Sequence, residues 1–312
     1  MIKDISSLPL RDAFISTLYF LAKKDKRIVL ITNDQGAPAL DKFVNDFPNQ
    51  FYNMGISEQN IIGVACGLAL EGFKPFIYSI NSFLIFRAYE NIKIDMCSMN
   101  LPVNIFGVGS GYSYPHDGPT HHSTEDLSLT IPLPNLEIFN PSDSLITSEI
   151  VKYVNKSKKP SFIRLDRQFC KRHYLKKNNL NDGFRTIISS KNNNKLAVFS
   201  TGYFISCLHD LIKEKKLKCD LIDLFKFKNL NYTKLKNIII KNYTRILTIE
   251  EHSINFGLGS ILSNIILENN LKVKLQKMAL QEKTLFGYGS RDQLLKKNNL
   301  DNRSIVKKIK SF

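Results

Sequence analysis

The sequence lacks the patterns that would place it in several common functional classes. It has no Gly-x-Gly-x-x-Gly and no Walker-type phosphate loop, so a nucleotide-binding site has little support. It also has no Arg-rich tract, zinc-finger spacing or RNP-like aromatic motif. The formal net charge is +16, but the lysines are spread through the second half of the chain rather than clustered. A diffuse charge favours solvated faces over a nucleic-acid surface, and we expect no nucleic-acid partner.

Cysteines and long apolar runs are scarce. The five cysteines contain no CxxC pair, which indicates reduced thiols in a cytoplasmic protein. The longest apolar run, residues 61–70, is far shorter than the ~20 residues of a membrane-spanning helix. The first 20 residues are interrupted by Asp4, Pro9 and Arg11, so we expect no signal peptide and no membrane contact.

Strand and helix patterns alternate in the first part of the chain and predict an α/β domain with a mostly parallel sheet. Short apolar runs give the strands, and apolar residues at helical spacing give the helices. Strands are expected at 27–32, 51–54, 74–80, 103–108, 136–140 and 161–165, and helices at 10–24, 41–47, 58–71, 83–99, 124–130 and 142–155.

A polar segment rich in Lys and Asn, residues 170–182, predicts a domain boundary. We expect a first α/β domain at 1–170, a linker at 171–182 and a smaller α/β domain at 183–312. Residues 184–189 and 195–201 are predicted to form a hairpin. Further strands are expected at 218–222, 244–248 and 273–278, with helices at 204–214, 232–242 and 260–269.

Two stretches have candidate binding residues next to strand ends, where ligand sites lie in open α/β sheets. Glu58 begins a helix for which Ser57 is the expected cap, and Gly72 the expected stop. Its carboxylate also complements the helix dipole, so a structural role stays open. Phe83, Phe86 and Tyr89 recur every three residues and form either core packing or an aromatic wall for a planar ring. Arg87 is interpreted as a surface charge.

The loop 107–122 is rich in glycine and contains Asp117, His116, His121 and His122. Histidine in such a loop suits proton transfer near neutral pH. Zinc is disfavoured because the histidines lack helical i, i+4 spacing and no cysteine is near, so we expect no metal ligands in this chain. Beyond the loop, Arg164 and Arg167 flank Asp166 and fit either phosphate binding or a structural Arg–Asp pair.

Taken together, five segments in order resemble the C-terminal half of transketolase, the thiamine-diphosphate enzyme, over nearly the whole chain. They are Gly-Ile-Ser-Glu-Gln-Asn at 55–60, Ser-Phe-Leu-Ile-Phe-Arg-Ala-Tyr at 82–89, Asp-Gly-Pro-Thr-His at 117–121, Pro-Ser-Asp at 141–143, and Ile-Glu-Glu-His-Ser at 249–253 with Gly-Leu-Gly at 257–259.

The resemblance implies a role for each candidate residue. Glu58 is expected to hydrogen-bond N1′ of the cofactor's aminopyrimidine and so to activate the cofactor, and His121 to bind the sugar and move its protons. The pocket of the pyrimidine ring is implied to be lined by Phe83, Phe86 and Tyr89, with Asp34 approaching the cofactor. The substrate is implied to contact Asp117, His121, His122 and Arg167.

One departure from the family implies a partner chain. Transketolases hold the cofactor's diphosphate and its divalent metal, Mg²⁺ or Ca²⁺, on a domain with a Gly-Asp-Gly motif, and this sequence has no Gly-Asp-Gly. The chain is therefore expected to be the beta-type subunit of a split transketolase, with two copies of each subunit. Glycines at 109 and 111 stand about where the family has a histidine, which leaves the sugar open.

Other functions remain as alternatives. A half-enzyme of the deoxyxylulose-phosphate-synthase kind shares the Asp-Gly-Pro-Thr-His loop, and a 2-oxo-acid-dehydrogenase beta subunit shares the C-terminal domain. A scaffold without catalytic activity would keep the fold but would not need Glu58, Asp117 and His121 together.

Overall fold

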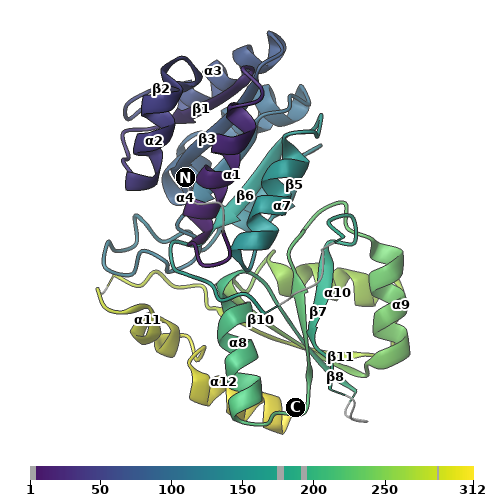
Figure 1. Ribbon diagram of the computed structural model, residues 1–312. Helices are drawn as coiled ribbons and strands as arrows, with labels where there is room; N and C mark the ends of the chain where they lie inside the picture. The colour runs from purple at the N-terminus through teal and green to yellow at the C-terminus, as the bar shows by residue number, and fades with distance from the viewer. Residues whose placement is uncertain (1–4, 174–178, 191–194, 287) are drawn as a thin grey trace.

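The computed structural model of the protein describes residues 5–173, 179–190, 195–286 and 288–312. The chain forms two α/β domains, each built on its own sheet, and Figure 1 shows one domain above the other. The predicted fold class is thus confirmed. None of the helices in the described ranges has the length and apolarity that a membrane-spanning helix needs.

The first sheet has six parallel strands in the order β2-β1-β3-β4-β6-β5. Both faces are covered, so successive residues of β1 enter different cores: Ile28 packs with α1 and α7, and Val29 with α3. The strands are β1 Ile28–Thr32, β2 Phe51–Asn53, β3 Lys74–Ile80, β4 Asn104–Val108, β5 Glu137–Phe139 and β6 Ser161–Leu165. The helices are α1 Leu10–Ala22, α2 Pro38–Asp46, η1 Pro48–Gln50, α3 Glu58–Leu70, α4 Asn81–Arg87, α5 Tyr89–Asn91, η2 Ile92–Ser98, α6 Asp126–Thr130 and α7 Ser144–Val154.

The second sheet has five strands in the order β11-β10-β8-β9-β7, with β7 antiparallel to β9. In Figure 1, α8 and α12 lie on one side of this sheet, and α9 and α10 on the other. The strands are β7 Phe184–Ile188, β8 Leu196–Ser200, β9 Asp220–Leu224, β10 Arg245–Ser253 and β11 Lys274–Leu280. The helices are α8 Tyr203–Glu214, α9 Tyr232–Asn242, α10 Leu258–Glu268, α11 Arg291–Lys297 and α12 Asn302–Ser311.

Two predicted elements are wrong. The hairpin of 184–189 and 195–201 does not form, because β7 pairs with β9 while β8 lies between β9 and β10; part of its connecting loop lies outside the described residues. The single helix 83–99 is interrupted after Arg87, where Ala88 leaves helical geometry, and it continues as α5 and the π-helical η2. The spacing of apolar residues alone does not distinguish an interrupted helix from a continuous one.

Buried ion pairs and hydrogen bonds join the two domains. Arg164 bonds Asp126 at 2.6 Å and also donates to the carbonyls of Ser123 and Glu251. Arg291 bonds Asp166 at 2.6 Å and Glu251 at 2.7 Å. Of the two alternatives left open for Arg164, the structure shows the structural Arg–Asp pair, with Asp126 as the partner, while Asp166 pairs with Arg291.

Replacing Arg291 by Met is expected to lower the free energy of unfolding by roughly 3–5 kcal/mol, because two buried carboxylates lose their counter-ion. Denaturant unfolding measures the change. Arg303→Met is the matched control, since Arg303 is exposed on α12, and it should change stability by less than about 0.5 kcal/mol. Equal losses in the two variants would contradict the proposed role of this network.

Burial of His252, helped by the nearby Arg164, lowers the pKa of its imidazole to about 4, against the opposing effect of Asp126. Below the ordinary value of about 6.5 the unfolded chain binds a proton that the folded chain does not, so stability falls as the pH drops towards 4. Between pH 7 and 5 this histidine should cost about 2 kcal/mol of stability. The free energy of unfolding of His252→Gln should fall less between pH 7 and 5 than that of the wild type. An equal fall in both proteins would show that His252 does not cause this pH dependence.

Candidate functional site

The parallel first sheet brings the predicted residues to one edge. The carboxyl ends of its strands all point the same way, so the segments that follow them meet there. Asp34 follows β1, Glu58 follows β2 and Phe83 follows β3, while the loop with His121 follows β4 and Arg167 follows β6. Residues spread over more than a hundred positions thus share one edge.

Amide side chains hold this edge together. The Asn33 amide donates to the carbonyl of Gly55 at 3.1 Å and accepts from the hydroxyl of Ser79 at 2.8 Å. Gln35 donates to the carbonyl of Tyr78 at 2.9 Å and accepts from the backbone N–H of Ile80 at 3.0 Å. These bonds fix the ends of β1 and β3 and the turn before α3 relative to each other. Asp34 stands between the two amides and is exposed.

Glu58 is the buried acid of the site. It is the first residue of α3, its side chain is 8% exposed, and its Oε1 accepts a hydrogen bond from Arg87 at 2.8 Å. Its Oε2 has no hydrogen-bond partner among the described residues. The expected cap is wrong, because the Ser57 hydroxyl donates to the carbonyl of Met54 instead of accepting from the helix. The helix ends as predicted near Gly72, whose φ is +84°.

Arg87 was missed by sequence reasoning as a site residue. Its guanidinium lies 4.7 Å from the centre of the Phe83 ring while it bonds Glu58. The i, i+4 spacing from Phe83 is a signal for the stacking, but α3 and α4 must be packed before the pairing with Glu58 can be seen.

The three aromatic residues differ in their surroundings. Phe83 is half-buried, and its ring meets the His121 ring edge-on, with the centres 4.7 Å apart. Phe86 is 40% exposed. Tyr89 packs against the first core, and its hydroxyl donates to the carbonyl of Leu129 at 3.1 Å. Phe83 is therefore the ring that joins Glu58 and Arg87 to the histidine loop.

The loop 109–123 is closed at its base and anchored to α4. Ser110 and Gly111 bridge to Ser123, and the Ser82 hydroxyl donates to the carbonyl of Thr120 at 2.9 Å. Gly111 has φ +60°, and a Cβ there would lie 2.7 Å from Cγ of Glu251, so the second domain supports the loop directly. This support holds His121 against Phe83.

The remaining substrate candidates occupy different depths. Asp117 and Arg167 are exposed, whereas His122 is 5% exposed and packs edge-on against Tyr112. Burial and the neighbouring His121 lower the pKa of His122, although Asp117 opposes the shift, so the ring is neutral at physiological pH. Its Nε2 has no hydrogen-bond partner among the described residues.

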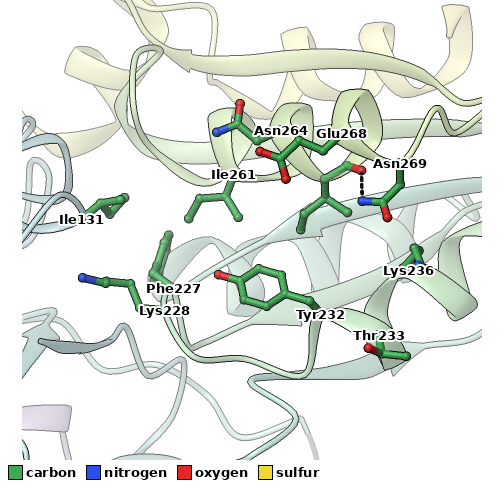
Figure 2. A pocket seen from close by; sticks show the side chains of 11 residues that line it. Ile131, Phe227, Lys228, Tyr232, Thr233, Lys236, Ile261, Asn264, Glu268 and Asn269 are labelled. Carbon is green, nitrogen blue, oxygen red and sulfur yellow. Dashed lines mark hydrogen bonds between the residues drawn. The ribbon is translucent and has the colours of Figure 1, made fainter. Parts of the chain in front are cut away.

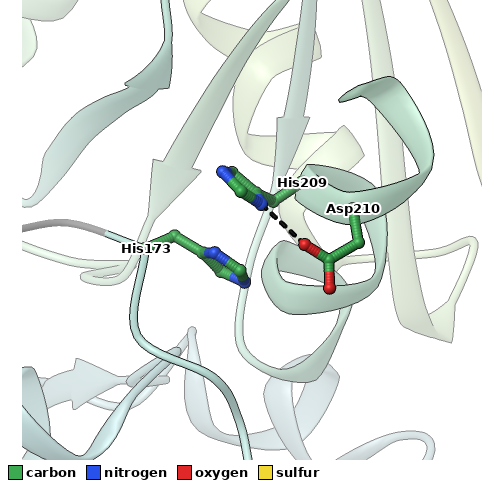
Figure 3. A group of neighbouring side chains, drawn as sticks. All are labelled: His173, His209 and Asp210. Carbon is green, nitrogen blue, oxygen red and sulfur yellow. Dashed lines mark hydrogen bonds and ion pairs between the residues drawn. The ribbon is translucent and has the colours of Figure 1, made fainter. Parts of the chain in front are cut away.

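One group in the described residues has the donor set of a metal site, and it lies away from this edge. His173, His209 and Asp210 place their ligand atoms within 4.8 Å of one another. Figure 3 shows the three side chains together, with the interaction between His209 and Asp210. The two imidazoles are stacked, with centres 3.6 Å apart and planes 25° apart. Stacked rings direct the lone pairs of their nitrogens roughly parallel to each other, which is unfavourable for binding one ion between them.

A cavity of about 570 Å³ lies between α9 and α10 of the second domain, and Ile131 of the first domain also lines it. Figure 2 shows Phe227, Tyr232 and Ile261 around it, with Lys228 at one end. None of the candidate site residues lines it, so it is separate from the edge that holds Glu58 and His121.

Comparisons with known proteins cover both domains. A model described as "Transketolase, pyrimidine binding domain" matches residues 6–171, and one described as "Transketolase, C-terminal domain" matches residues 188–305. The chain is 28% identical to an apulose-4-phosphate transketolase subunit of Phocaeicola vulgatus, over 97% of this chain and 96% of that protein. It is 27% identical to 1-deoxy-D-xylulose-5-phosphate synthase of Clostridium tetani, over 95% of this chain but only 48% of that protein.

Solved structures agree with this likeness. A split-gene transketolase, described as an inactive beta4 tetramer, superposes with a TM-score of 0.85 at 27% identity, covering 97% of each chain. The transketolase of Campylobacter jejuni shares the fold, with a TM-score of 0.79 at 18% identity over all of this chain and 48% of that one.

Replacing Arg87 by Ala is expected to lower the free energy of unfolding by about 1 kcal/mol, because the buried Glu58 carboxylate loses a half-exposed partner. Thermal or denaturant unfolding measures it. In a Glu58→Gln background the same replacement should have little effect. Lys42→Ala, which removes the exposed pair with Asp46 on α2, is the control. An Arg87 effect that is independent of Glu58 would rule out the coupling.

Proposed function

This chain belongs to the transketolase family, as a beta-type chain with the pyrimidine-binding and C-terminal domains. We propose that, together with a partner subunit, it transfers a two-carbon ketol unit from a ketose to an aldose. The supporting observation is the single edge where buried Glu58, the Phe83 ring and His121 follow one another. We propose that the two domains span residues 1–170 and 183–312. We also propose a cytoplasmic location, which fits the free cysteines.

The residues of the edge fit the pyrimidine of thiamine diphosphate. When bound, this cofactor would supply a nucleophilic thiazolium carbon and would stabilise the negative charge of the two-carbon unit. Glu58 has one carboxylate oxygen without a partner among the described residues, so this oxygen can share a proton with N1′ of the aminopyrimidine in a hydrogen bond. Phe83 is linked to this acid through Arg87, whose guanidinium lies 4.7 Å from the ring centre, and we propose that the rest of the ring packs against the pyrimidine. Phe86, Tyr89 and Asp34 complete the proposed pocket.

At the other end of the edge, polar groups suit a sugar. Asp117 is exposed and can accept a hydrogen bond from a sugar hydroxyl, and Arg167 can bind an anionic oxygen. His121 stands between Phe83 and the open side of the loop, where an imidazole can bind the carbonyl and move a proton. His122, buried and neutral, orients the sugar through its free Nε2.

A partner subunit completes the proposed site. The sequence contains no Gly-Asp-Gly, so we place the diphosphate and its Mg²⁺ or Ca²⁺ mainly on an N-terminal-type chain. We propose two copies of each subunit, since closed two-fold assemblies are the common solution for such pairs. The chain alone would then be inactive.

A second candidate is a half-enzyme of the deoxyxylulose-phosphate-synthase kind. The matches to synthases of that name span 95% of this chain in the Clostridium tetani protein. Such an enzyme decarboxylates pyruvate, so a mixture of the two subunits that releases carbon dioxide from pyruvate, and does not use a ketose donor, would replace the main proposal.

Replacing Glu58 by Gln is expected to abolish ketol transfer in the reconstituted pair, by at least about 10³-fold in kcat, because the amide cannot take up the proton. Thermal unfolding of the variant should stay close to the wild type, since the side chain keeps its shape. Calorimetric titration with thiamine diphosphate should show binding only when both subunits are mixed. Retained turnover in Glu58→Gln, or tight cofactor binding by this chain alone, would refute the proposal.

The control variant is Glu268→Gln. Glu268 is exposed on α10 and lines the cavity of Figure 2, away from the proposed site, so the replacement removes a carboxylate without touching the edge. Its transfer rate should equal that of the wild type.

A further inference from the structure

Tyr114 lies at the centre of the substrate end of the edge, although its sequence position does not single it out. Its ring meets the His121 ring edge-on, with centres 5.8 Å apart. The guanidinium of Arg167 lies 5.1 Å from the centre of the same ring, on the side of β6. The phenol thus connects His121 to Arg167, two of the four substrate candidates at this end.

The ring position depends on the glycine at 109. Gly109 has φ +106°, and a Cβ built on it would lie 2.5 Å from Cε2 and 2.7 Å from Cδ2 of Tyr114. Carbon atoms do not approach so closely, so a side chain at 109 and the present position of the Tyr114 ring exclude each other. The aromatic ring therefore takes the space beside β4 that a side chain at 109 would enter.

The hydroxyl of Tyr114 is available as a donor. Among the described residues it has no hydrogen-bond partner, while its ring is half-buried. Burial raises the pKa of the phenol, against the opposing effect of Arg167 and Arg11, so the proton stays on the oxygen at neutral pH. A half-buried donor without a protein partner is suited to a ligand oxygen.

We propose that Tyr114 is a substrate-binding residue that sets sugar specificity: its ring limits the space beside His121, and its hydroxyl donates a hydrogen bond to an oxygen of the sugar. This inference rests on the proposed function, because it takes the edge as a sugar site. It adds a contact that the motif residues do not supply, and it assigns the specificity to the pair Gly109–Tyr114.

The kinetic test uses the reconstituted pair with ketose donors and aldose acceptors that differ in length and phosphorylation. Tyr114→Phe should raise KM for one of the two substrates about tenfold with kcat within about twofold, because it removes a single hydrogen bond. Tyr114→Ala opens the subsite, so kcat/KM for longer sugars should rise relative to shorter ones by about tenfold. Tyr232→Phe, at an exposed tyrosine of α9, is the control and should match the wild type.

A binding measurement separates this inference from the proposed function. Calorimetric titration of the pair with an aldose phosphate should show weaker binding to Tyr114→Phe, and an unchanged affinity for thiamine diphosphate. A wild-type pair without transfer activity overturns the proposed function, while the sugar titration still tests Tyr114. Unchanged KM and sugar affinity in both Tyr114 variants would overturn the inference, as would an equal loss of cofactor affinity, which indicates a structural role.

Stability measurements test the steric pair. Gly109→Ala should lower stability and change sugar preference in the direction of Tyr114→Ala, because the new methyl group displaces the ring. In the double variant the clash is gone, so its stability loss should be smaller than the sum of the single losses. Additive losses of unfolding free energy would show that the Tyr114 ring and position 109 do not interact. The assignment of sugar specificity to the pair Gly109–Tyr114 would then be wrong.

Discussion

The parallel register of the first sheet is the constraint on which the site depends. Every strand in it runs the same way, so five segments separated by helices end at one edge. Parallel strands need crossover connections, and these connections carry the binding groups out of the sheet. Reversing one strand would move its segment to the opposite edge and separate Glu58 from His121.

Buried charges then fix the loop that carries the histidines. Glu251, from the second domain, accepts from the backbone N–H of Tyr112 at 2.6 Å and is itself held by Arg291. Arg164 holds the far end of the loop through the carbonyl of Ser123. The C-terminal domain therefore positions the loop while it contributes none of the candidate site residues. Buried pairs of this kind do little for net stability, but removing one partner is costly, so they define one arrangement.

The two arginines beside aromatic rings show how the site combines charge and shape. Arg87 lies on Phe83 and binds the acid, and Arg167 lies on Tyr114 near the loop. Each guanidinium is partly exposed, so it can exchange its protein contact for a ligand at small cost. This arrangement supports the proposal of a planar ring at the Glu58 end and a hydroxylated, anionic sugar at the Arg167 end.

Local patterns in the sequence were sufficient for the alternation of strands and helices and for the α/β class, because apolar periodicity depends on near neighbours. Most of the candidate site residues came from the five motifs that resemble the transketolase family. β3 and β6 have the predicted limits, and Glu58 begins its helix as expected. The order of the second sheet, the break after Arg87, the pairing of Arg87 with Glu58 and the fit of Tyr114 over Gly109 were decided only by the tertiary structure. Each of these depends on contacts between elements, and such contacts have no period along the chain.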